Sequence, residues 1–138
     1  MKDSVQDGAI KMKLYRVILP VKNIDQATLF YTKLTGDGGT RVSPGRHYFN
    51  CDGVILACYD PVADGDPVGP KTIQHMHQYL YFSVSDLAAM KQCVIEAGGT
   101  ITADIETMPW GECLFYATDP FGNQIAVTDQ RTVYLGPE

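Results

Sequence analysis

Residues 17–31, VILPVKNIDQATLFY, decide the fold, because the same order of elements returns at residues 80–94 as LYFSVSDLAAMKQCV. Each stretch is an apolar, strand-like run, followed by Asn23 or Asp86 and then by apolar residues at helical spacing. Asn and Asp both suit the start of a helix, since their side-chain oxygen accepts a hydrogen bond from a free backbone N–H of the first turn. An internal repeat determines architecture more firmly than local propensity does. We therefore expect two copies of one structural unit.

Each copy continues into an antiparallel meander. Gly36 and the Gly98–Gly99 pair are placed to end the two helices in a left-handed cap. Asp52-Gly53 is a typical two-residue hairpin turn, which would place Tyr48 opposite Ala57. Residues 119–129, DPFGNQIAVTD, repeat the turn and final strand in the second copy. The sequence predicts an α+β fold in which two βαβββ modules form a curled mixed sheet around a concave groove.

The 138 residues are expected to form a single domain. The first module covers about residues 13–60 and the second about residues 76–130, with a connector at 61–75 and a tail at 131–138. Residues 60–74, DPVADGDPVGPKTIQ, are rich in Pro, Asp and Gly, which is typical of an exposed connector in which little packs. The tail is expected at the periphery, although a terminal segment can also cross to a partner subunit.

Composition excludes several classes of partner. Eleven Lys and Arg against sixteen Asp and Glu give a net charge of −5, the wrong sign for binding nucleic acid or an anionic membrane surface. No apolar run approaches the roughly 20 residues of a membrane helix, and the N-terminus lacks a signal-peptide pattern. The four cysteines form no C-x-x-C pair, so we expect free thiols and a cytoplasmic location.

Strand parity separates two faces in each module. Val17, Leu19 and Val21 should lie under one helix, and Leu80, Phe82 and Val84 under the other. The opposite, inner face is polar and aromatic, which indicates a small-molecule site rather than a packed core. The alternative is a partly wet interior whose tyrosines and asparagines satisfy one another. The candidate ligand-binding residues are Arg16, Tyr48, Asn50, Ala57, Tyr59, His77, Tyr79, Tyr81, Trp110, Glu112, Gln124 and Ala126.

Several short motifs accompany this repeat. The strand-to-helix junctions at 21–24 and 84–87, the Phe30-Tyr31 pair, Pro-Trp-Gly at 109–111 and Asp-Pro-Phe-Gly-Asn at 119–123 together resemble the vicinal oxygen chelate superfamily. That superfamily includes glyoxalase I, extradiol dioxygenases, fosfomycin-resistance enzymes and bleomycin-resistance binding proteins, and the resemblance covers about residues 14–129. It implies a homodimer in which the partner shares or closes the groove.

The resemblance also implies where a metal would be bound. In metal-dependent members the ligands are His, Gln, Glu or Tyr on the first and last strands of each module. The matching positions here are Arg16, Ala57, Tyr79 and Ala126. Alanine has no donor atom, and arginine is permanently cationic. We therefore expect no metal and no cofactor, and we assign no catalytic residue.

The favoured function is the binding of a small aromatic or polar molecule between the modules, without chemistry. Arg16 can clamp a carboxylate or phosphate-like group, or it can pair with an internal acid such as Glu112. One alternative is a metal-dependent lyase or dioxygenase with a displaced site at His75, His77 and Glu112. Another is a metal-free enzyme in which Tyr79 or Tyr48 acts as the acid and Arg16 stabilises negative charge.

Overall fold

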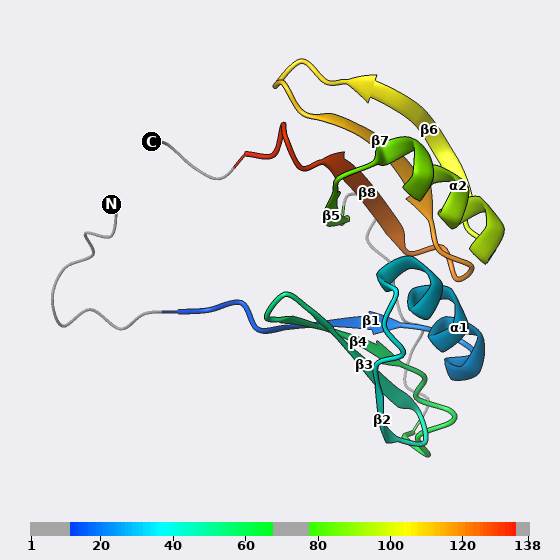
Figure 1. Cartoon of the computed structure of the whole chain (residues 1–138). Coiled ribbons are helices and arrows are strands. Elements are labelled where there is room, and N and C mark those ends of the chain that lie inside the picture. Colours follow the sequence, from blue (N-terminus) through cyan, green and yellow to red (C-terminus); the bar gives the residue numbers. More distant parts are fainter. Residues whose placement is uncertain (1–11, 68–77, 135–138) are drawn as a thin grey trace, which may run out of the picture.

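The computed structural model describes residues 12–67 and 78–134 (Figure 1). It confirms the α+β class and the repeated βαβββ order. The first module contains β1 (Arg16–Pro20), α1 (Ile24–Thr35), β2 (Thr40–Ser43), β3 (Arg46–Cys51) and β4 (Val54–Tyr59). The second module contains β5 (Leu80–Val84), α2 (Leu87–Ala97), β6 (Thr100–Thr107), β7 (Cys113–Thr118) and β8 (Gln124–Asp129).

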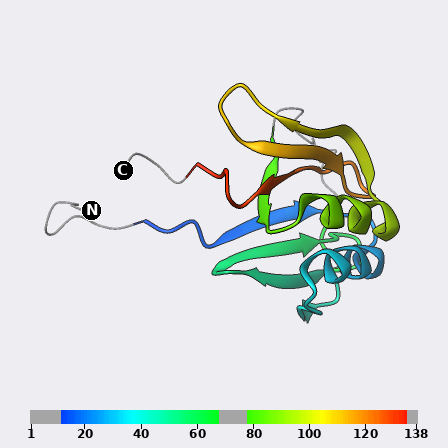
Figure 2. The same cartoon turned by 45° about the horizontal axis from the view of Figure 1, so that its top comes forward.

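Each module contributes one mixed, four-stranded sheet, ordered β1-β4-β3-β2 in the first and β5-β8-β7-β6 in the second. The first and last strands of each module are parallel neighbours, and the other pairs are antiparallel. Tyr48 pairs with Ala57 as the hairpin turn predicts, and Tyr116 occupies the equivalent place opposite Ala126. The sheets are curled and are not closed into a barrel, and α1 lies beside α2 (Figure 2).

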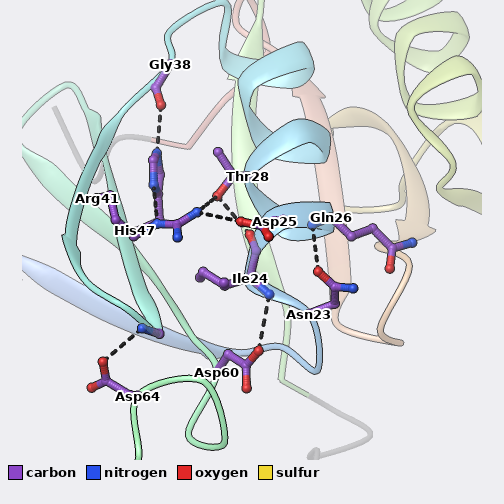
Figure 3. Close-up of polar contacts among 11 residues, drawn as sticks. Asn23, Ile24, Asp25, Gln26, Thr28, Gly38, Arg41, His47, Asp60 and Asp64 are labelled. Carbon is purple, nitrogen blue, oxygen red and sulfur yellow. Dashed lines mark hydrogen bonds and ion pairs between the residues drawn. The ribbon is translucent and has the colours of Figure 1, made fainter.

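The predicted helix caps are confirmed. Asn23 Oδ1 accepts from the Gln26 amide at 3.0 Å (Figure 3), and Asp86 Oδ1 accepts from the Ala89 amide at 3.0 Å. Both bonds satisfy N–H groups that a first helical turn leaves free. The helices end at Gly36 and Gly98, which have φ values of 74° and 101°. These are left-handed conformations that glycine adopts without strain.

Strand alternation produces the core as expected. Leu19, Phe49 and Leu56 pack with α1, and Phe115 and Val127 pack with α2. The helix-facing residues of β5, Leu80 and Phe82, touch both clusters, so the modules share one apolar seam. The inner faces of the strands carry residues that belong to neither cluster, such as Ala57 and Ala126.

Polar contacts cross the same seam. The Tyr31 hydroxyl on α1 donates to Asp119 Oδ2 at 2.7 Å, and both residues are buried. Asp119 also accepts from the backbone amides of Phe121 and Asn123, at 2.9 Å each. The Asn123 side chain donates to the Pro20 carbonyl at 2.9 Å. The turn between β7 and β8 is therefore bonded to both α1 and β1 of the other module.

A buried histidine anchors the edge strand of the first module. Nε2 of His47 lies 2.7 Å from the Gly38 carbonyl, and its Nδ1 accepts from Arg41 Nε at 3.1 Å. Arg41 also pairs with Asp25 on α1 at 3.1 Å (Figure 3). These contacts hold β2 against the helix, which accounts for His47 as a structural residue.

The start of the connector is ordered and packed, so the expectation that little packs there is wrong for residues 60–67. Asp60 is buried, and its Oδ2 accepts from the Ile24 amide at 3.2 Å (Figure 3). Asp64 Oδ1 accepts from Ser43 Oγ at 2.6 Å and from the Gly45 amide at 2.8 Å. These aspartates are typical of a linker in composition, but here they accept hydrogen bonds from backbone N–H groups. Residues 68–75 of the connector and 135–138 of the tail lie outside the described residues.

All four cysteines are free thiols, as expected: Cys51, Cys58, Cys93 and Cys113. Burial raises the pKa of the fully covered Cys58 thiol to about 12. In the described ranges, neither helix has the length and apolarity needed to cross a membrane.

Candidate functional site

Arg16 lies on the inner face of the first module between two tyrosines. Its Nη1 donates to the Tyr48 hydroxyl at 2.9 Å, and its Nη2 donates to the Tyr15 hydroxyl at 3.0 Å. The guanidinium carbon also lies 5.6 Å from the ring centroid of Tyr48 and 5.2 Å from that of Tyr15, within cation–π range. The two phenols fix the guanidinium in place without neutralising its charge.

Strand pairing explains this arrangement. β4 lies between β1 and β3, with Arg16 opposite Ile55 and Tyr48 opposite Ala57. The Arg16 side chain therefore reaches Tyr48 diagonally across β4. Among the residues that the structure describes, no ion pair includes Arg16.

Glu112 does not neutralise Arg16, so the predicted alternative of an internal ion pair is not found. Glu112 Oε1 accepts from the indole N–H of Trp110 at 2.9 Å. Its Oε2 accepts from the backbone amide of Tyr134 at 3.1 Å. The acid is therefore held by the second module and its C-terminal segment.

The second module carries an aromatic cluster at the positions equivalent to Arg16 and Tyr48. The ring of Tyr79 lies 5.3 Å from that of Tyr116 and 6.4 Å from that of Tyr81. A hydrogen bond with Tyr81 raises the pKa of Tyr116 to about 12, with smaller contributions from partial burial and from nearby groups that include Glu112. Tyr116 is consequently a neutral hydrogen-bonding group at physiological pH.

The inner-strand positions do not fit the metal implied by the resemblance. Ala57 and Ala126 are 2% and 0% exposed and offer only methyl groups, and Arg16 offers a cation. Across residues 12–67 and 78–134, no group of three or more His, Cys, Asp and Glu side chains could hold a metal ion. Of the proposed displaced ligands, His75 and His77 lie outside the described residues.

The remaining predicted site residues have local partners. Asn50 Oδ1 accepts from the Gly53 amide at 2.8 Å and so stabilises the hairpin turn. The Tyr59 hydroxyl bonds to Asp66, and the Arg46 guanidinium lies 4.4 Å from the centroid of its ring. Gln124 Nε2 donates to the Gln78 carbonyl at 3.3 Å.

Two cavities open on the described surface. One, of about 110 Å³, lies between β1 and the start of β5, and Tyr79 and Gln124 contribute to its lining. The other, of about 240 Å³, lies on the inner face of the second module and is lined by Tyr81, Phe82, Ser83, Glu112, Thr128, Val133 and Tyr134. Both volumes fall below the roughly 300–1,000 Å³ of a drug-sized ligand site.

Several residues of these clusters are not among the predicted site residues, including Tyr15, Tyr116, Thr128 and Tyr134. Tyr116 could have been predicted from the repeat, because it lies opposite Ala126 as Tyr48 lies opposite Ala57. Thr128 lies on the last strand beside Ser83, but nothing in the sequence marks it as a polar group without a partner. Tyr134 belongs to the segment treated as a peripheral tail.

A sequence model of the Glyoxalase/Bleomycin resistance protein/Dioxygenase superfamily matches residues 13–127. This chain belongs to that superfamily. The match includes every helix and strand except the last two residues of β8. Membership accounts for the paired βαβββ modules.

Several solved structures share the fold. A glyoxalase-related enzyme from Fulvimarina pelagi is 18% identical with a TM-score of 0.74, over 91% of this chain and 94% of that one. A glyoxalase/bleomycin resistance protein from Albidiferax ferrireducens is 21% identical with a TM-score of 0.68, over 83% and 95%. An integron cassette protein from the V. cholerae mobile metagenome is 25% identical with a TM-score of 0.65, over 88% and 98%. No curated protein is significantly similar to the chain.

Proposed function

We propose that this superfamily member binds a small organic molecule with an anionic group in the groove between its modules, without a catalytic metal. Arg16 is the anion-binding group, and Tyr15 and Tyr48 form the aromatic walls beside it. The observation that carries the proposal is the Arg16 guanidinium, which two phenols hold in place and no described carboxylate neutralises.

The chemistry of the guanidinium supports a carboxylate or a similar planar anion. A guanidinium has five N–H donors, and the two bonds to tyrosine leave further donors for a bidentate contact. The flanking rings offer flat apolar surface to an aromatic ligand. Because the chain has a net charge of −5, affinity for an anion must come from this local group rather than from the overall field.

The alternatives have less support. A displaced metal site would need His75 and His77 beside Glu112, and in the described ranges Glu112 belongs to no group of three or more His, Cys, Asp and Glu side chains that could hold a metal ion. Tyr48 accepts a hydrogen bond from Arg16, and Tyr79 lies against the rings of Tyr81 and Tyr116. Homodimer formation and a cytoplasmic location stay predictions from the sequence.

Calorimetric titration with benzoate tests the proposal, with benzyl alcohol as the neutral ligand of matched shape. We expect benzoate to bind and Arg16→Gln to weaken it about 10-fold or more, since hydrogen bonds to charged groups contribute about 1.5–3 kcal/mol. Tyr48→Phe keeps the ring but removes the hydroxyl that holds Arg16. We therefore expect this variant to lose less benzoate affinity than Arg16→Gln. Lys22→Gln removes an exposed positive charge outside the cluster and is the matched control.

Two results would contradict the proposal. Equal benzoate affinity in the wild type, Arg16→Gln and Lys22→Gln proteins would make Arg16 a structural residue. A stoichiometric, tightly held transition metal in protein purified without chelator would contradict the metal-free part, and elemental analysis measures it.

A further inference from the structure

The cavity of about 240 Å³ on the second module has a lining unlike that of the Arg16 cluster. Its floor is the inner face of β5 and β8, where Ser83 pairs with Thr128. Its mouth is bordered by Val133 and Tyr134 of the segment that follows β8. This cavity has more than the roughly 30 Å³ that one water occupies in the liquid, so it can hold a small chemical group.

One residue of the cavity lining, Thr128, has a buried hydroxyl without a partner. Thr128 is 2% exposed, and its Oγ1 has no hydrogen-bond partner among the described residues. A buried polar atom without a partner is unfavourable by about 1–3 kcal/mol, so native structures rarely contain one. A hydrogen bond donated to this hydroxyl by a ligand would remove that unfavourable contribution.

A carboxylate of fixed position borders the same cavity. Glu112 is held by Trp110 on one oxygen and by the Tyr134 amide on the other, and no described ion pair includes it. An ionised carboxylate has about four acceptor sites, so acceptor capacity is left over. Since none of the lining residues is cationic, the cavity combines a negative charge with hydroxyl groups and aromatic rings.

The C-terminal segment is bonded in place over the start of β7. Thr132 Oγ1 accepts from the Cys113 amide at 3.0 Å and donates to the Asp129 carbonyl at 2.8 Å. Together with the Tyr134 amide bond to Glu112, these contacts make the mouth of the cavity part of the folded structure.

We propose that this cavity is a binding site for the primary ammonium group of a small organic amine. The ammonium donates to Glu112 and to Thr128 Oγ1, and Tyr81 and Tyr134 lie beside the cation as aromatic walls. A primary ammonium supplies three N–H donors and one positive charge, which are the two properties that the lining lacks. The proposal uses none of the residues that carry the anion proposal, so either can fail alone.

The test uses the full-length protein and three probes of one shape. Benzylamine is protonated at pH 7, benzyl alcohol is neutral, and benzyltrimethylammonium is cationic but has no N–H donor. The only tryptophan, Trp110, bonds to Glu112 and so reports binding by its fluorescence. Calorimetry provides a second measurement for variants that alter the tryptophan environment. We expect saturable binding of benzylamine and much weaker binding of the other two.

Thr128→Val is the decisive variant, because the hydroxyl it removes has no partner in the fold. We expect about fivefold weaker benzylamine binding, equivalent to a hydrogen bond of about 1 kcal/mol, with an unchanged or higher melting temperature. Thr128→Ser should keep both affinity and fold. Glu112→Gln should weaken benzylamine about 10-fold or more by calorimetry, and Glu106→Gln is the control on an exposed acid.

Unchanged benzylamine affinity in both Thr128→Val and Glu112→Gln would overturn the proposal. Binding of benzyl alcohol as tight as that of benzylamine would also overturn it, because it would indicate an apolar site. Binding of benzyltrimethylammonium as tight as that of benzylamine, together with an unaffected Thr128→Val variant, would indicate a site for cations in general and would overturn it too. Absence of saturable benzylamine binding to the wild type would also overturn it, whatever the result with benzoate.

Discussion

Tyr31→Phe should destabilise the chain because it removes one hydrogen bond from a buried carboxylate. The lost bond is the 2.7 Å contact from the Tyr31 hydroxyl to Asp119, while the backbone amides of Phe121 and Asn123 still donate to that carboxylate. A hydrogen bond to a charged group contributes about 1.5–3 kcal/mol, so we expect the free energy of unfolding to fall by about 2 kcal/mol. For a chain of 138 residues this corresponds to a melting temperature lower by about 7 °C.

The same bond predicts an alkaline effect with a definite sign. Burial, reinforced by the charge of Asp119, raises the pKa of Tyr31 well above its ordinary value of 10.0. Above pH 10 the unfolded state loses this proton and the folded state keeps it, so stability falls as pH rises. Tyr31→Phe lacks this proton, and its stability should therefore fall less steeply than that of the wild type.

Urea unfolding at pH 7 and over pH 9–11 measures both effects, with Tyr134→Phe as the matched control on an exposed tyrosine. A free energy of unfolding at pH 7 equal to that of the wild type would mean that the bond makes no net contribution. Identical alkaline slopes for the wild type and Tyr31→Phe would show that another group carries the pH dependence.

Three further changes have expected outcomes. In Gly99→Ala the new Cβ would lie 2.7 Å from Val94 Cγ1, so overpacking should lower the free energy of unfolding by about 1–3 kcal/mol in urea titrations; wild-type stability would show that the seam can relax. Iodoacetamide at pH 8 should leave Cys58 unmodified in the native protein because its thiol is buried and its pKa is about 12, and peptide mass spectrometry that finds it labelled before unfolding would contradict this. Arg131 lowers the pKa of Asp129 to about 2, so the pair stabilises the fold above pH 3.8 and this effect is lost as pH falls toward 2. The melting temperatures of the wild type and Arg131→Ala should therefore converge over that range. A constant difference between them would assign the effect to packing.

The elements could be predicted from the sequence because their causes are local. Asn23 and Asp86 cap the helices with side chains that reach only three residues along the chain. Asp52-Gly53 determines the register of β3 and β4 because both residues adopt positive φ, at 54° and 97°. These signals need no knowledge of the other module.

The site could be predicted only in part, because its partners come from distant segments. Parity placed Arg16 and Tyr48 on one face, but whether Arg16 would meet a tyrosine or Glu112 depends on tertiary packing. The turn made by Asp60 and Asp64 has the composition of a linker, and only the neighbouring backbone amides show that it packs. The cavity at Thr128 depends on a terminal segment with no regular structure.

The alternation of side chains along β1, β4, β5 and β8 has an evolutionary consequence. On each strand one set of alternate positions supports the fold, as Leu19 does on β1, whereas the positions between them face the other side, as Arg16 and Ile18 do. Replacement of a protruding residue alters what the molecule recognises at little expense in folding free energy. Substitutions at these positions can change the ligand during evolution. A few such substitutions can also remove a metal site while the hydrophobic core is kept.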